Sequence, residues 1–166
     1  QKAIKINITL ASDNIYARSE IKEGSKYITD ASLSPDGERL AITSRGEVFN
    51  VPSDKGVIKN ITRTPGAHER NAQWSPNGQF IAYISDATGE TALYLQDAKG
   101  SEPIELTKDN DTYIRSFIWS PNSKSIVYVD RKNCLNLLNV TSKKKEMLLQ
   151  DPVGEPQEIS FSPDGK

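Results

Sequence analysis

The stretch Trp74-Ser75-Pro76-Asn77-Gly78 decides the fold, because the chain contains this pattern four times. The other copies are Leu33-Ser34-Pro35-Asp36-Gly37, Trp119-Ser120-Pro121-Asn122-Ser123 and Phe161-Ser162-Pro163-Asp164-Gly165. The prolines stand at positions 35, 76, 121 and 163, so the spacings are 41, 45 and 42 residues. A period of this length with strand-like sequence between the copies indicates the blades of a β-propeller.

The residues of the pattern suit a tight turn between two strands. Proline presets φ for the second turn position, Asp or Asn suits the next position, and Gly accepts the left-handed conformation that closes the turn. In the third copy Ser123 replaces this Gly, so we expect Asn122 to take the unusual backbone angle or the turn type to change. The apolar residue two places before each proline ends the incoming strand, where we expect it to pack against a neighbouring blade.

We therefore predict an all-β chain of β-propeller blades, each a four-stranded antiparallel sheet, in an incomplete ring of about three and a half blades. Apolar runs bounded by Gly and Asp clusters predict the strands within each blade. We expect residues 1–27 to form a connection and residues 28–62, 63–107 and 108–149 to form three blades. Residues 150–166 would be the first strand and turn of a truncated further blade.

Composition and charge exclude several classes of protein. The 21 basic and 22 acidic residues give a net charge of -1, so no bulk field favours nucleic acid or an anionic membrane. No apolar run approaches the ~20 residues of a membrane helix. The single cysteine, Cys134, excludes an internal disulfide and any multi-cysteine metal site. We interpret it as a buried thiol, because leucines surround it in the sequence.

The sequence contains no catalytic, cofactor-binding or metal-binding constellation. Its single histidine, His68, has no nucleophile placed beside it in any known motif. The serines at positions 34, 75, 120 and 162 recur because the turn favours a short hydroxyl side chain before proline. We expect them to be structural, and we expect no catalysis from this chain itself.

One set of polar residues carries a functional hypothesis. The first strand of each propeller blade lines the central channel, and polar residues stand five and six positions before each turn proline. At these positions they would face water in the channel, or they would cap the strand ends without touching a ligand. The eight candidates are Thr29, Asp30, Arg70, Asn71, Arg115, Ser116, Gln157 and Glu158.

The chain begins at Gln1 and stops one residue past the fourth turn, as we expect of a piece of a longer protein. An open arc of blades exposes apolar faces and unpaired strand edges, so we expect the chain to self-associate. The compartment stays open between the cytoplasm and the periplasm of a prokaryote.

Several segments resemble the second propeller of tricorn-type proteases. The specific ones are Ser44-Arg45-Gly46-Glu47-Val48-Phe49 and Ser85-Asp86-Ala87-Thr88-Gly89-Glu90, with Glu69-Arg70 and Trp74-Ser75-Pro76 between them. The resemblance covers most of residues 28–149 and makes residues 1–27 the connection from a preceding propeller. The bare Ser-Pro-Asp-Gly repeat is shared with TolB-like propellers.

This resemblance implies a serine peptidase in which two propellers precede a PDZ-like module and a protease core. The chain would then be a non-catalytic segment that gates access and channels unfolded peptides or protein substrates to a core outside it. No residue of the chain matches the family's catalytic serine or histidine. The alternative is a TolB-like propeller that serves as a scaffold for protein–protein interaction without enzymatic activity.

Overall fold

The chain folds into three antiparallel sheets of four strands each. A computed structural model describes residues 23–107, 113–150, 154, 159–162 and 164–165. The strands are β1 (Ile28–Leu33), β2 (Arg39–Ser44), β3 (Glu47–Pro52), β4 (Lys59–Asn60), β5 (Glu69–Trp74), β6 (Phe80–Ser85), β7 (Ala92–Asp97), β8 (Ile104–Glu105), β9 (Ile114–Trp119), β10 (Ser125–Asp130), β11 (Cys134–Asn139) and β12 (Lys145–Gln150).

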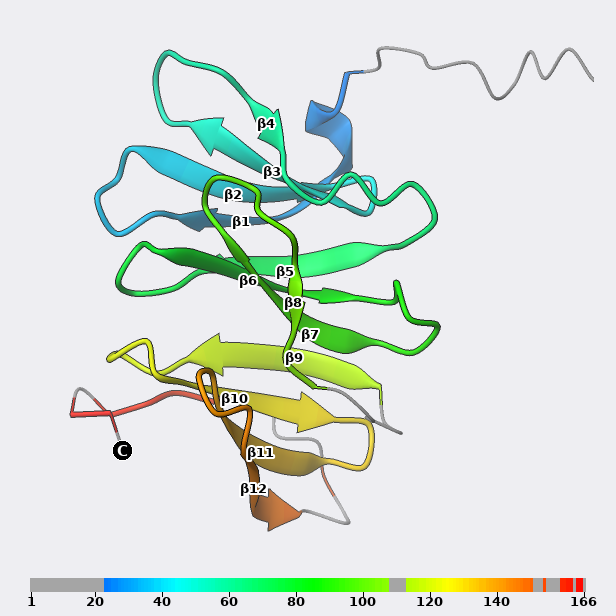
Figure 1. The fold of residues 1–166 in the computed structure, drawn as a ribbon, viewed down its shortest axis with the longest axis vertical. Helices are drawn as coiled ribbons and strands as arrows, with labels where there is room; N and C mark the ends of the chain where they lie inside the picture. Colours follow the sequence, from blue (N-terminus) through cyan, green and yellow to red (C-terminus); the bar gives the residue numbers. More distant parts are fainter. Residues whose placement is uncertain (1–22, 108–112, 151–153, 155–158, 163, 166) are drawn as a thin grey trace, which may run out of the picture.

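Each sheet is a meander, with strands in the orders β1-β2-β3-β4, β5-β6-β7-β8 and β9-β10-β11-β12. We call these sheets A, B and C. They stack along the long axis of the molecule (Figure 1), which confirms the predicted all-β class and the incomplete ring of blades. The short helix η2 (Ser25–Tyr27) precedes sheet A. Within the described ranges, no helix has the length and apolar character needed to cross a membrane.

The repeated serine holds each turn together. The buried Ser75 hydroxyl lies 2.7 Å from Asn77 Oδ1 and accepts a hydrogen bond from the backbone N–H of Phe80 at 3.0 Å. The same pair of bonds recurs around Ser34 and around Ser120. In the fourth copy the Ser162 hydroxyl lies 2.5 Å from Asp164 Oδ1. The serines are therefore structural, because their hydroxyls satisfy backbone groups of the turn.

The third turn differs from the expectation. Ser123 itself takes the left-handed conformation, with φ of 59°, where Gly37 and Gly78 have φ of 75° and 69°. The alternative in which Asn122 carries this angle was wrong, and the turn keeps the backbone hydrogen bond of the other copies, from the Ser123 N–H to the Ser120 carbonyl at 2.9 Å. Asn122 instead keeps the same bond to serine as its equivalents. The Ser123 hydroxyl accepts a hydrogen bond from the backbone N–H of Asn77 at 3.0 Å, so the serine links two neighbouring turns.

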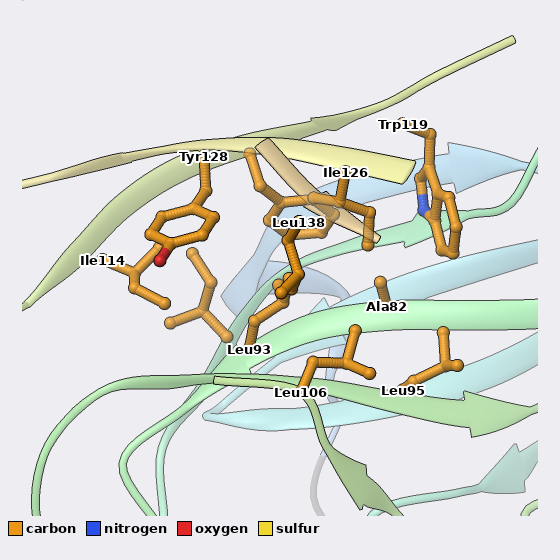
Figure 2. Close-up of a cluster of buried hydrophobic side chains, with 11 residues drawn as sticks. Ala82, Leu93, Leu95, Leu106, Ile114, Trp119, Ile126, Tyr128 and Leu138 are labelled. Atoms are coloured by element: carbon orange, nitrogen blue, oxygen red, sulfur yellow. The ribbon is translucent and has the colours of Figure 1, made fainter. Parts of the chain in front are cut away.

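Two apolar clusters between the sheets form the core. The cluster between sheets A and B contains Trp74, and the cluster between sheets B and C contains Trp119. In Figure 2 the Trp119 ring lies beside Ile126 and above Ala82 of the neighbouring sheet. Both tryptophans are under 10% exposed, which confirms that they fill equivalent positions between blades.

Leu33 occupies the same repeat position but is 59% exposed, so the expected packing was wrong for this copy. Ser32 faces sheet B, because its hydroxyl accepts a hydrogen bond from the Trp74 backbone N–H at 3.1 Å. Successive side chains of a strand point to opposite faces, which turns Leu33 to the other face of sheet A. Among the described residues, sheet A is the last sheet of the stack on that side (Figure 1).

Truncation of either tryptophan should destabilise the chain strongly. Trp74→Ala and Trp119→Ala should each lower the free energy of unfolding by about 3–5 kcal/mol, as for other buried aromatic residues. Denaturant melts measure this loss. Leu33→Ala is the matched control at the exposed copy of the same position, and it should cost less than about 1 kcal/mol. Equal losses at Leu33 and Trp74 would contradict the assignment of the clusters.

Candidate functional site

The first strand of each sheet contains an irregularity near the predicted channel-facing residues. The register shifts between Ile28 and Asp30 in β1, between Arg70 and Gln73 in β5, and opposite Val129 and Asp130 in the pairing of β9. A β-bulge interrupts the ladder and changes the direction of side chains. The candidate residues on β1, β5 and β9 thus stand at or next to a bulge, and Asn71 has φ of 55°.

These three strands line one groove of about 480 Å³, which we call the inner groove. Asp30 and Asn71, two of the predicted residues, lie in it beside Ser32 and Gln73. The remaining lining residues are Ala31, Ala72, Trp74, Ile118 and Trp119. The groove therefore presents a carboxylate, two amides and a hydroxyl next to apolar surface.

Hydrogen bonds across the groove join the first strands of neighbouring sheets directly. The backbone N–H of Asn71 donates to Asp30 Oδ2 at 3.3 Å, and Gln73 Nε2 donates to the Phe117 carbonyl at 3.1 Å. Sequence reasoning missed Ser32 and Gln73 as groove residues. Ser32 lies two positions further along the same strand face as Asp30, so the period-2 alternation of strands could have found it. The bulge between Arg70 and Gln73 interrupts this alternation in β5, so Gln73 had no such signal.

Three other candidates make hydrogen bonds to backbone carbonyls, and Arg70 reaches the carbonyl of Arg115, itself a candidate. The Arg70 guanidinium donates to the carbonyls of Ile114 and Arg115, the latter at 3.1 Å, and lies 4.7 Å from the centre of the Tyr113 ring. Thr29 donates to the Thr43 carbonyl at 3.5 Å, and Arg115 to the Arg131 carbonyl at 3.5 Å.

Arg70 therefore bridges sheets B and C, whereas Ser116 is half-buried on β9. Gln157 and Glu158 lie outside the described residues. The assignment of the eight residues to a water-filled channel stays a prediction.

A carboxylate is buried between sheets A and B. Glu69 is 1% exposed, and its Oε1 accepts hydrogen bonds from the hydroxyls of Thr64 at 2.8 Å and Ser85 at 2.9 Å. Its Oε2 has no hydrogen-bond partner among the described residues. Burial raises the pKa of this carboxyl, the three hydroxyls of Thr64, Ser85 and Thr62 oppose the rise, and the charge of Glu47 adds to it.

The described part of the chain shows no group of three or more His, Cys, Asp or Glu side chains placed to hold a metal ion. His68 is exposed, and its backbone N–H donates to Asp86 Oδ1 at 2.7 Å. The Cys134 thiol is buried at 7% exposure, as predicted.

The buried Glu69 should make stability depend on pH. Its pKa is higher in the folded chain than its ordinary value of 4.5, so the folded state holds the proton more tightly than the unfolded state. The contribution to stability is present below that value and is lost as pH rises through the raised pKa. Glu69→Gln keeps the volume and removes the titration. The variant should gain stability relative to the parent as pH rises, as measured by denaturant melts from pH 4 upward. Parallel curves would contradict the burial of a titrating carboxyl.

Comparison with known proteins places this geometry in a family. The chain is 30% identical over 149 residues to the uncharacterized peptidase YuxL of Bacillus subtilis (strain 168), covering 84% of this chain and 22% of that protein. Its fold matches the crystal structure of the tricorn protease with a TM-score of 0.74 at 16% identity, over 89% of this chain and 15% of that one. The putative TolB from Agrobacterium tumefaciens matches with a TM-score of 0.67 at 25% identity, over 83% of this chain and 51% of that one.

The chain thus spans much less than two thirds of each of these proteins. The sequence profile described as the tricorn protease second beta propeller domain matches residues 28–166, which include all three sheets and the fourth turn. The resemblance seen in the sequence is confirmed, and the chain belongs to the family of tricorn protease second β-propeller domains.

Proposed function

We propose that the chain is a non-catalytic propeller segment that gates and channels unfolded peptides toward a serine protease core outside it. The observation that carries this proposal is the inner groove, in which Asp30 of β1 and Asn71 and Gln73 of β5 stand along two neighbouring first strands. Carboxylate and amide side chains can exchange hydrogen bonds with the N–H and C=O groups that every peptide carries. Such a surface recognises an extended chain with little dependence on its sequence.

The groove is suited to passage rather than to tight binding. Its polar atoms already make bonds between the strands, such as Asn71 N to Asp30 Oδ2 and Gln73 Nε2 to the Phe117 carbonyl. A rigid lining costs no side-chain ordering when a peptide enters. Because these side chains are engaged within the protein, they offer weak additional contacts, which favours release.

A second function is a TolB-like scaffold that docks a folded protein partner without enzymatic activity. The similarity to the putative TolB from Agrobacterium tumefaciens supports it. The two functions differ in what a blocked groove changes. If the chain is a gate, a blocked inner groove stops the passage of peptides. If it is a scaffold that docks partners on its outer face, a blocked inner groove leaves partner binding unchanged.

An obstruction in the inner groove tests the gate. Ala31 lines the groove and is exposed, so Ala31→Trp adds a large side chain there without disturbing the core. In the full-length protein this variant should slow the hydrolysis of unfolded casein several-fold and leave that of a short fluorogenic peptide unchanged. Ala87→Trp, at an exposed turn away from the groove, is the control. Unchanged casein hydrolysis in both variants would favour the scaffold.

The chain alone should show no peptidase activity, because no nucleophile–base pair was found in its sequence. Purified chain incubated with unfolded casein and fluorogenic peptides should release product at the rate of buffer alone. Activity that follows the chain through purification and disappears in His68→Ala would contradict this expectation.

A further inference from the structure

A second groove, of about 450 Å³, lies where the outer parts of sheets A and B meet. We call it the outer cationic groove, after Lys59, Arg63 and Lys99 in its lining. Buried Gln96 ties its two sides together, because Nε2 donates to the Ile61 carbonyl of one side at 2.9 Å and to the Ser101 carbonyl of the other. The groove is therefore a fixed feature of the joint between two blades.

The charge in this groove is unbalanced. Lys59, Arg63 and Lys99 are all exposed, and Glu102 is the one acidic residue of the lining. Within the described ranges, the ammonium groups of Lys59 and Lys99 make no hydrogen bond or ion pair, and Arg63 uses Nε alone, on the Asn60 carbonyl at 3.3 Å. The terminal guanidinium nitrogens and both ammonium groups remain available to a ligand.

Arg63 is held in an unusual backbone conformation. Its φ is 50°, in the left-handed region that side chains other than Gly seldom adopt. The Asn60 side chain fixes this conformation, because Oδ1 accepts the Arg63 backbone N–H at 3.1 Å. Strained residues that persist are over-represented at binding sites. Here the strain and the Asn60 contacts set the position of the guanidinium before any ligand arrives.

The repeat itself does not require the cation at position 59. Thr62 and Thr107 are equivalent, since each hydroxyl accepts the backbone N–H of the strand beside it, from Val48 and Leu93. Ile104 and Glu105 thus stand where the first blade has Lys59 and Asn60. At the second joint Lys143 Nζ donates to the Glu105 carbonyl at 3.0 Å, so that lysine is engaged within the protein. The cation of Lys59 is therefore not repeated at the second joint, whereas Lys108, at the position equivalent to Arg63, lies outside the described residues.

We propose that the outer cationic groove binds an extended peptide segment with clustered carboxylates from a protein partner. β4, which supplies Lys59 and Asn60 to the lining, is the last strand of sheet A, so it has an edge that no strand of its sheet pairs. Such an edge can add an extended peptide through main-chain hydrogen bonds. Carboxylates on that peptide complement the three cations. The lining contains no aromatic residue on which a nucleic-acid base could stack. This site is separate from the inner groove and independent of the proposed gate.

Charge removal tests the site directly. Binding of a fluorescein-labelled peptide of alternating Glu and Gly to the 166-residue chain is followed by anisotropy. The triple variant Lys59→Gln, Arg63→Gln, Lys99→Gln should bind about tenfold more weakly, on the scale of a few exposed ion pairs. The matched control is Lys124→Gln, Lys132→Gln, Lys144→Gln, which removes the same charge at exposed sites of sheet C and should bind like the parent. Equal losses in the two variants, or no loss in either, would overturn the proposal.

A variant that is expected to bind more tightly excludes a folding defect as the cause of the weaker binding. Glu102→Gln removes the one carboxylate of the groove and should tighten binding of the acidic peptide several-fold. A peptide of alternating Gln and Gly should bind none of the variants. Tighter binding of oligodeoxythymidylate than of the acidic peptide, lost in the same triple variant, would assign the groove to nucleic acid and refute the peptide proposal.

Discussion

Each sheet of this chain must be covered by another sheet, because the described residues include no helix beyond η2 to cover it. A four-stranded sheet with apolar residues on both faces is stable in water only between neighbours. The aromatic side chains that end β5 and β9 meet this need, since each reaches back to the preceding sheet. Trp74 packs against sheet A and Trp119 against sheet B, and the stacking of Figure 1 follows from these two contacts and the clusters around them.

The serine turn places those aromatic residues. Ser75 follows Trp74 directly, and its hydroxyl bonds both the Asn77 side chain and the backbone of Phe80 on the outgoing strand. This fixes where the first strand ends and therefore where the indole sits. A change in the turn would shift the aromatic residue relative to the neighbouring sheet. The local pattern and the long-range packing are thus one constraint at the Trp74 and Trp119 copies, where they occur together.

Much of the fold could be predicted because this constraint is local in sequence. The apolar residue two places before each proline was expected to end the incoming strand, and β1, β5 and β9 do end at Leu33, Trp74 and Trp119. The bulges could not be predicted, because register depends on the partner strand and not on the bulged residues alone. The site was predicted only in part, because the local turn pattern sets the positions of some of its residues and the packing of neighbouring sheets sets the others. Counting back from the proline found Asp30 and Asn71, whereas the contact of Arg70 with the carbonyls of sheet C depends on how neighbouring sheets pack.

Comparison of the repeats also shows which residues of this chain the fold does not require. Glu69 pairs with Ser85, just as Ile28 pairs with Ser44 and Ile114 with Asp130, so a carboxyl stands where the other blades have isoleucine. Its burial raises its pKa, which is a cost to the fold at neutral pH and no requirement of the propeller. The cations of the outer groove belong to the same joint between sheets A and B. Because the sheets are equivalent units, comparing them separates two kinds of residue. Residues that the units share serve packing. A residue that is costly to the fold or unpaired, and that is not repeated in the other units, points to a role specific to its own joint.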